Sequence, residues 1–213
     1  MNRDVADLRR DYARSELRRD NVDASPIHQF ARWLNEALAA ELPEPNAMTL
    51  ATAGPDGKPH ARVLLLKGFD DQGFVFYTNY LSAKGRELEH NPQAAMVFLW
   101  LALERQVRIE GTVSKVSREQ SELYFHSRPY GSQIGAVASH QSQPIASREE
   151  LDQRAEQLQA RYPEAPVPMP EHWGGYRLEP GVIEFWQGRT SRLHDRLRYE
   201  RRDSGWHIDR LEP

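Results

Sequence analysis

Cysteine is absent from this 213-residue chain. Its absence excludes disulfides, thiolate nucleophiles and cysteine-ligated metals. Long apolar runs are also lacking, so no membrane-spanning helix is expected. The N-terminus carries charge from Arg3 onward and has no apolar stretch typical of a secretion signal. The cytoplasm is therefore the expected location.

A large excess of charge of either sign is missing too. The chain has 28 Lys and Arg residues against 31 Asp and Glu residues, a formal net charge of −3. Nucleic-acid-binding domains normally have a basic face, so no nucleic-acid partner is expected. The eight histidines show no metal-ligand spacing, and sequences typical of a Walker loop, a nucleophile elbow or a dinucleotide site are absent. No metal is predicted.

Hydrophobic periodicity predicts one α+β, mainly β domain. Ser25-Pro26 has the sequence of a helix start, and apolar residues at helical spacing continue to about Leu42. Ser82, Ser117 and Ser147 begin further short helices. Alternating segments bounded by turn residues predict strands at 48–53, 61–67, 74–78, 95–101, 106–116, 176–178, 182–186, 197–201 and 206–211.

Short strands joined by tight turns are typical of an antiparallel barrel with helices packed outside it. We expect such a domain at residues 25–213. The preceding residues 1–24 are polar and weakly patterned, which predicts a flexible N-terminal arm.

Two cationic residues bracket an apolar run in the second predicted strand. Arg62 and Lys67 flank Val63-Leu64-Leu65-Leu66, and such side chains are rarely buried without a partner. They are either strand-end residues that reach water or part of an anion site. Strict alternation along a strand directs the Arg62 and Lys67 side chains to opposite faces of the sheet. A single site that used both residues would therefore need a bulge, a strand end or a ligand that spans the sheet edge.

A second group combines an arginine with two hydroxyls. Tyr124 lies in the last turn of the helix begun at Ser117, Arg128 lies in a loop, and Ser132 begins the next helix. Free backbone N–H groups at a helix start favour anions. The group could bind phosphate, although ordinary helix capping explains the pattern about as well.

A third group follows the aromatic strand that ends at Trp186. Arg192, His194 and Arg196 alternate and would project from one face of an extended segment. Arginine stacks on planar rings and binds anions, and histidine supplies a proton near neutral pH. The alternative is an exposed edge strand kept soluble by charge.

Taken together, these residues resemble the pyridoxine/pyridoxamine 5'-phosphate oxidase family over nearly the whole chain. The most specific stretches are residues 62–67, 76–79, 104–107, 124–129, 132–135, 184–188 and 192–196. The resemblance implies an FMN-binding split β-barrel with surrounding helices. It also implies a homodimer that holds the flavin in clefts between subunits.

The resemblance also assigns site residues. It implies flavin contacts from Arg62, Val63, Leu64, Leu65, Leu66, Lys67, Tyr77, Thr78, Lys84, Gln106, Gln141, Ser142, Trp186 and Arg196. It implies substrate contacts from Arg9, Tyr12, Lys67, Tyr124, Arg128, Ser132, Arg192 and His194. Arg192 and His194 would act in catalysis over the substrate ring, and Arg9 and Tyr12 would belong to an N-terminal lid.

One position departs from the family pattern. The family usually has a basic residue just before the lysine matched by Lys84, and this chain has Ala83. One expected contact to the FMN phosphate is therefore missing, or only backbone contacts remain, which predicts looser flavin binding.

The implied reaction is the FMN-dependent oxidation of pyridoxine 5'-phosphate or pyridoxamine 5'-phosphate to pyridoxal 5'-phosphate. O2 would be the electron acceptor and H2O2 the second product. Two alternatives remain: a split-barrel flavoenzyme that acts on a different aromatic substrate, and a flavin-binding dimer without turnover.

Overall fold

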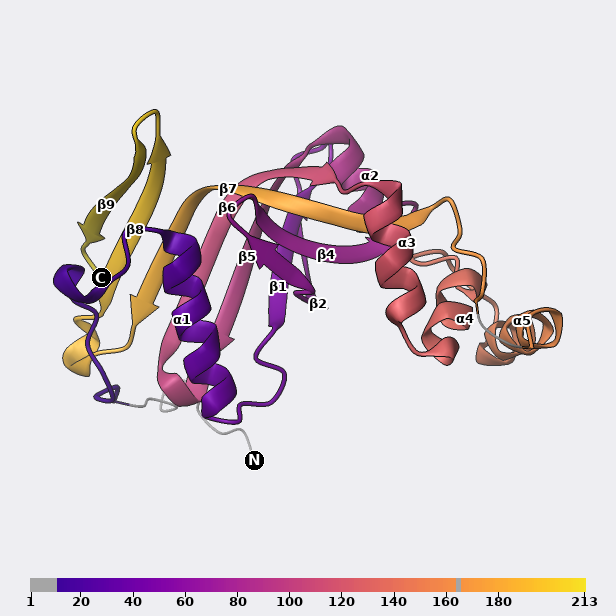
Figure 1. Ribbon diagram of the computed structural model, residues 1–213, viewed down its shortest axis with the longest axis horizontal. Coiled ribbons are helices and arrows are strands. Elements are labelled where there is room, and N and C mark those ends of the chain that lie inside the picture. The colour runs from indigo at the N-terminus through magenta and orange to yellow at the C-terminus, as the bar shows by residue number, and fades with distance from the viewer. Residues whose placement is uncertain (1–10, 164–165) are drawn as a thin grey trace. The chain divides into compact units, whose positions relative to one another are not determined.

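The structure, a computed structural model, describes residues 11–163 and 166–213 (Figure 1). The chain divides into two compact units, each built from segments that are distant in sequence. The first unit takes in the described part of Met1–Thr49 together with Ala95–Glu110 and Pro180–Pro213. The second takes in Leu50–Ala94 and Gly111–Glu179.

Nine strands of the described residues are hydrogen-bonded into one sheet. Along its main path their order is β2-β1-β5-β6-β7-β4-β3, while β8 pairs with β7 and β9 pairs with β8. The strands are β1 (Ala47–Ala53), β2 (Pro59–Leu65), β3 (Gly68–Asp70), β4 (Gly73–Asn79), β5 (Gln93–Trp100), β6 (Arg105–Lys115), β7 (Trp173–Gln187), β8 (Asp195–Arg202) and β9 (Gly205–Leu211).

The predicted helix starts are confirmed, because a serine cap is a local signal. The Oγ atoms of Ser25, Ser82, Ser117 and Ser147 each accept a hydrogen bond from a backbone N–H three residues later. The helices are α1 (Pro26–Ala39), α2 (Ala83–His90), α3 (Arg118–Ser127), α4 (Tyr130–Ala138) and α5 (Arg148–Arg161).

Helix α1 ends three residues before the predicted end at Leu42. Glu41 has a positive φ of 50°, and its N–H donates to the carbonyl of Leu38. Pro43 disfavours the helical conformation at Leu42. The chain therefore leaves the helix before Leu42.

The first unit buries an aromatic core beneath α1. Phe30 packs edge-on against Phe98 of β5, and Trp33 packs edge-on against Phe185 of β7. Phe30, Trp33 and Ala37 are fully or almost fully buried, whereas Leu38 is 54% exposed. The buried stripe therefore passes through Trp33 and Ala37, and Leu38 lies outside it.

Strand β7 is one continuous strand where two strands were predicted. Its first part, Trp173 to Leu178, pairs with β4, and its last part, Val182 to Gln187, pairs with β8. The intervening segment contains Pro180-Gly181, a residue pair that is common in turns. Proline is tolerated there because its missing N–H lies outside both of these ladders.

In the second unit, β3 and β4 form a tight hairpin whose short first strand was not predicted. Gly73 has a φ of 131°, and a Cβ at this position would lie 2.0 Å from the carbonyl oxygen of Leu178. Only glycine fits this approach.

A separate cluster of buried residues packs around helices α3, α4 and α5, which lie together in Figure 1. It consists of Phe125, Ile134, Val167, Met169 and Trp173. This cluster supports the cavity described below. No helix in the described part of the chain is long and apolar enough to cross a membrane.

Candidate functional site

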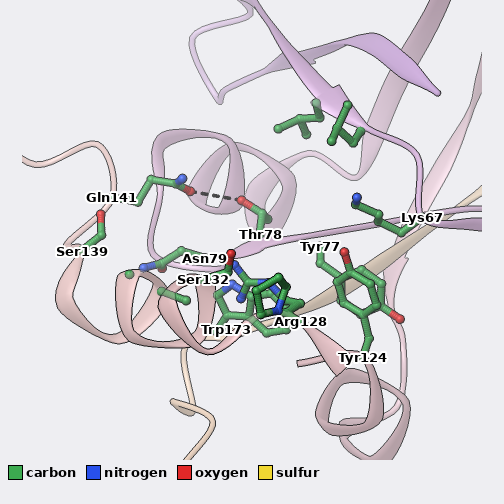
Figure 2. Close-up of a pocket in the computed structure, with 15 residues that line it drawn as sticks. Lys67, Tyr77, Thr78, Asn79, Tyr124, Arg128, Ser132, Ser139, Gln141 and Trp173 are labelled. Carbon is green, nitrogen blue, oxygen red and sulfur yellow. Dashed lines mark hydrogen bonds between the residues drawn. The ribbon is translucent and has the colours of Figure 1, made fainter. Parts of the chain in front are cut away.

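A cavity of about 620 Å³ lies within the second unit (Figure 2). Its walls come from the end of β2, the end of β4, helices α3 and α4, the segment after α4 and the start of β7. The lining residues are Leu64, Leu65, Lys67, Tyr77, Thr78, Asn79, Tyr124, Arg128, Pro129, Ser132, Gly135, Ala136, Ser139, Gln141 and Trp173.

Arg128 places a half-buried positive charge on the wall of this cavity. Its Nη1 is buried and has no hydrogen-bond acceptor among the described residues. Its guanidinium carbon lies 4.8 Å from the centre of the Trp173 ring. Burial lowers the pKa of Arg128 from the usual arginine range. A buried cation without a hydrogen-bonding anion is costly, so this position is suited to binding an anion.

The other members of the second predicted group lie around the same cavity. Tyr124, in the last turn of α3, stacks on Tyr77 with a ring separation of 3.9 Å. Ser132 lies in the first turn of α4, which begins two residues earlier than predicted because Pro129 acts as its N-cap. The structure thus brings Tyr124, Arg128 and Ser132 to one cavity, as the phosphate hypothesis requires.

Lys67 reaches the cavity because β2 ends before it. The strand ends at Leu65, and the N–H of Lys67 donates to the carbonyl of Val75 at 2.9 Å. Its exposed side chain lies above the Tyr77–Tyr124 pair in Figure 2. Lys67 thus reaches the cavity from beyond the strand end, whereas Arg62 is not among the lining residues.

Lys84 forms a second, separate cationic position. It is 6% exposed, and its Nζ donates to Thr78 Oγ1 at 3.3 Å, Ser82 Oγ at 3.3 Å and Gln141 Oε1 at 3.2 Å. Burial lowers the pKa of Lys84, and the nearby Arg62 lowers it further. All three hydrogen-bond acceptors are neutral, so of the described residues only the nearby Glu87 carboxylate, which acts to raise the pKa of Lys84, offsets part of the charge.

Arg62 is held by Thr52 of β1 and Glu87 of α2 and is not among the residues that line the cavity. Its Nη2 lies 3.1 Å from Glu87 Oε2, and its Nη1 donates to Thr52. Burial acts to raise the pKa of Glu87, but hydrogen bonds from Thr52 and Arg62 keep that pKa below its usual value. Part of the Arg62 charge is therefore already balanced.

The remaining residues of the apolar run differ in exposure. Leu64 and Leu65 line the cavity, while Val63 is 68% exposed and Leu66 is buried. Gln141 lines the cavity, and its Oε1 accepts a hydrogen bond from Thr78 at 3.1 Å, drawn in Figure 2. Ser142, next in the chain, is exposed with a φ of 70°.

In the first unit, three rings from distant segments meet. The Trp186 ring lies 4.6 Å from the His194 ring, and Tyr12 packs edge-on against Trp186 at 5.9 Å. His194 Nδ1 accepts a hydrogen bond of 3.1 Å from the N–H of Arg189. Burial lowers the pKa of His194, and the neighbouring Arg192 lowers it further. A neutral imidazole at this position therefore carries its proton on Nε2.

The predicted row of Arg192, His194 and Arg196 on one extended face is wrong. Residues Thr190–Arg192 form a 3-10 helix, and β8 begins only at Asp195. Ser191 and Arg192 have positive φ values of 55° and 59°. Such backbone conformations cost non-glycine residues roughly 1–3 kcal/mol each and break the alternation on which the prediction rested. The Arg192 side chain is exposed.

Arg196 is engaged by a buried carboxylate. Its Nε and Nη2 lie 2.8 Å and 3.0 Å from the two oxygens of Glu184, which is 6% exposed. The hydrogen bonds that Arg196 donates to Glu184 raise the pKa of Arg196. Gln106 lines a cavity of about 280 Å³ in this unit, together with Tyr12 and Trp186. Arg9 lies outside the described residues.

Sequence reasoning missed Trp173, Asn79 and Ser139 as lining residues of the larger cavity. The available signal was the glycine pair Gly174-Gly175 beside Trp173, a pattern more typical of a tight turn that belongs to β7 in the structure. A Cβ at Gly175 would lie 2.7 Å from Tyr77 Cε1. The glycine therefore lets the Tyr77 ring approach this strand.

Comparison with known families identifies matches along most of the chain. Residues 34–162 match the family described as pyridoxamine 5'-phosphate oxidase. Residues 173–213 match the pyridoxine 5'-phosphate oxidase C-terminal dimerisation region. The predicted homodimer agrees with this second match.

Curated relatives are similar over nearly their full length. A pyridoxine/pyridoxamine 5'-phosphate oxidase of Acaryochloris marina is 59% identical over 209 residues, which are 98% of this chain and 95% of the relative. One of Bordetella petrii is 60% identical over 210 residues, which are 98% and 99% of the two chains.

Solved structures confirm the predicted fold class. PhzG from Burkholderia lata 383, in complex with tetrahydrophenazine-1-carboxylic acid, has a TM-score of 0.87 and 36% identity, covering 91% of this chain and 95% of that one. A pyridoxamine 5'-phosphate oxidase-related FMN binding protein from Nostoc punctiforme has a TM-score of 0.73 at 18% identity, covering 89% and 98%, which shows the shared fold. The chain belongs to the pyridoxamine 5'-phosphate oxidase family of flavin-dependent oxidoreductases.

Proposed function

We propose that the protein oxidises pyridoxine 5'-phosphate or pyridoxamine 5'-phosphate to pyridoxal 5'-phosphate, with FMN as cofactor and O2 as acceptor. The observation that carries the proposal is Arg128, which lines the cavity and whose buried Nη1 has no acceptor among the described residues. A phosphate oxygen would supply the missing acceptor. The names of the curated relatives support the same substrates.

The residues fit a second phosphate, that of FMN. Lys84 is buried among three neutral acceptors, so an anion beside it would restore charge balance. Arg62 contributes less, because Glu87 already neutralises part of its charge. Family membership implies that Leu64, Leu65, Tyr77, Gln106, Gln141, Ser142, Trp186 and Arg196 contact the rest of the cofactor. When bound, FMN accepts a hydride from the substrate and transfers the electrons to O2, which yields H2O2.

The substrate phosphate would be held by the group around Arg128. Arg128 supplies the charge, Tyr124 and Ser132 supply hydroxyl donors, and the Lys67 ammonium adds a second positive charge. These contacts are the same in the ground state and in the transition state, so they set affinity. They also fix one end of the substrate, which orients its ring.

Arg192 and His194 would act on the substrate ring. The planar guanidinium of Arg192 can cover the ring. His194 offers an Nε2–H, because its Nδ1 accepts the N–H of Arg189. That N–H can donate to an oxygen substituent of the ring. The homodimer brings two copies together, and the family resemblance implies that each flavin site draws on both subunits.

Residues 1–24 remain a proposed lid. Within the described part of this segment, Tyr12 contacts the Trp186 ring, and the N–H of Leu17 donates to Asp195 Oδ2 at 3.0 Å. Tyr12 and Leu17 thus lie near the residues proposed to cover the substrate ring, which supports the proposed lid.

The test is an assay of the flavin-loaded dimer with pyridoxine 5'-phosphate, pyridoxamine 5'-phosphate and unphosphorylated pyridoxine. We expect pyridoxal 5'-phosphate and H2O2 in equal amounts from the first two substrates. We expect a much higher KM for pyridoxine, because Arg128 and Lys67 then lack their anion. A flavin-loaded protein that forms neither product from the phosphorylated substrates would refute the proposal.

The main alternative is a flavoenzyme for a different aromatic substrate, in view of the likeness to PhzG. A carboxylate could also pair with Arg128. The sequence identity to the pyridoxine/pyridoxamine 5'-phosphate oxidases is much higher, at 59% to 60%. Turnover of the phosphorylated substrates would support the proposed function. It would exclude a flavin-binding dimer without activity and would argue against a different aromatic substrate.

A further inference from the structure

We propose that Trp173 is the positioning residue for Arg128, and that it fixes the guanidinium without neutralising it. This inference rests on the proposed function, because it concerns how Arg128 is oriented to bind the substrate phosphate. Trp173 lies 45 residues away from Arg128 in the sequence and was not among the predicted site residues.

The contacts of Arg128 explain why such a residue is needed. An arginine is usually held by a carboxylate, and the described residues place none within ion-pair distance of Arg128. Its backbone is fixed instead, because Gln133 Nε2 donates to the Arg128 carbonyl at 2.8 Å and the Arg128 N–H donates to Phe125 at 3.3 Å. The end of the side chain rests over the Trp173 ring at 4.8 Å and more distantly over Phe125 at 5.7 Å.

The Trp173 ring is itself rigidly held. Trp173 is 6% exposed, and it pairs with Asn79 in the ladder between β7 and β4. Its ring is nearly parallel to those of Tyr124 and Tyr77, at interplanar angles of 8° and 13°. One aromatic stack therefore carries Arg128 and also holds Tyr124, a second residue of the proposed phosphate position (Figure 2).

The chemical consequence is a cation that is ordered but not compensated. A carboxylate partner would hold Arg128 and also cancel the charge that a phosphate needs. The face of an indole attracts a guanidinium through its quadrupole and carries no net charge. Arg128 can therefore keep its place on the cavity wall while its charge stays unpaired and its Nη1 lacks an acceptor among the described residues.

The test compares KM and kcat for pyridoxine 5'-phosphate in flavin-loaded variants. Trp173→Leu should raise KM by roughly two- to thirty-fold, the range expected for loss of a cation–π contact, with much less change in kcat. Trp173→Phe, which keeps a smaller aromatic face, should give an intermediate KM. The KM for unphosphorylated pyridoxine should change far less in both variants.

A double-mutant comparison separates positioning from a structural role. In the Arg128→Leu background, Trp173→Leu should raise KM no further, because there is no guanidinium left to position. Met169→Ala is the matched control. It removes buried volume from the same cluster, so it should lower the melting temperature and leave KM near that of the wild type.

Equal effects of Trp173→Leu with and without Arg128 would overturn the inference, as would a wild-type KM in the flavin-loaded single variant. Should Trp173→Leu not fold, Trp173→Phe in the two backgrounds decides by the same comparison. A wild-type protein that does not oxidise pyridoxine 5'-phosphate would instead refute the proposed function. The two failures are therefore distinguishable.

Discussion

The backbone N–H of Arg189 donates to Nδ1 of His194 across 3.1 Å. This bond places the proton of the neutral imidazole on Nε2, and protonation of Nδ1 would break it. Burial and the neighbouring Arg192 both keep the pKa of His194 below its usual value. The bond and the lowered pKa both favour a neutral histidine that donates through Nε2.

The pH dependence of kcat/KM should reflect this neutral histidine. Because the pKa of His194 is lowered, the neutral form persists to more acidic pH, and the loss of activity should begin below the ordinary imidazole pKa of about 6.5. His194→Asn should lower kcat/KM and remove the acid limb that belongs to the imidazole. The substrate phosphate has a second pKa near 6 and titrates with the wild type and with His194→Asn alike. The measurement is therefore the difference between the pH profiles of these two proteins. Identical profile shapes would contradict the assignment.

Arg192→Leu should lower kcat/KM by more than tenfold while the protein stays folded, dimeric and yellow. The substitution removes the cation proposed to cover the substrate ring and keeps similar bulk, and tenfold corresponds to about 1.4 kcal/mol of transition-state stabilisation. It also removes a charge that lowers the pKa of His194, so the acid limb should move to higher pH. Arg202→Leu, at the end of β8, is the matched control and should behave as the wild type. A flavin-loaded Arg192→Leu enzyme with normal kinetics would rule out the proposed role.

Flavin affinity should depend on the start of helix α2. Lys84→Met removes the buried cation there, so FMN should bind at least about tenfold more weakly, the size expected for a lost charge-assisted hydrogen bond. Arg86→Met removes an exposed charge from the same helix and should have a much smaller effect. Equilibrium dialysis at two salt concentrations measures both affinities.

Ala83→Arg should act in the opposite direction at the neighbouring position. Ala83 is the first residue of α2, and an arginine there would add the basic residue that the family usually has, so FMN should bind more tightly and resist high salt better. Ala83→Gln, which adds length without charge, is the control. If arginine and glutamine had the same effect, the missing charge would not be the cause of weak flavin binding.

Dissociation of the homodimer should release the flavin. The family resemblance implies that each flavin site is completed across the subunit interface, and residues 173–213 match the family's dimerisation region. Sedimentation at decreasing protein concentration, followed by flavin absorbance and protein absorbance together, tests this. A monomer that sediments with its full flavin content would contradict the prediction.

The helix starts could be predicted from the sequence because their signals are local. Ser82 and Ser147 lie beside the N–H groups that they cap. The cavity residues Tyr124, Arg128 and Ser132 were also grouped correctly, because a short loop joins α3 and α4. Residues this close in the sequence are held near one another by the short connection alone.

Long-range contacts could not be predicted in the same way. The ring of Trp173 lies beneath Arg128 only because β7 pairs with β4 and carries the indole to that position. Glu184 balances Arg196 through the pairing of β7 with β8. The positive φ values at Ser191 and Arg192 interrupt an alternation that otherwise looked regular. No local pattern encodes these pairings.

The most direct test of the proposed oxidation is an anaerobic titration of the flavin-loaded dimer with pyridoxine 5'-phosphate, followed by visible absorbance. The proposed function predicts that an amount of substrate equal to the flavin bleaches the oxidised flavin spectrum and appears as pyridoxal 5'-phosphate. Admission of O2 should then restore the spectrum and release an equal amount of H2O2. A flavin spectrum that stays oxidised in the presence of excess pyridoxine 5'-phosphate and pyridoxamine 5'-phosphate would contradict the proposal.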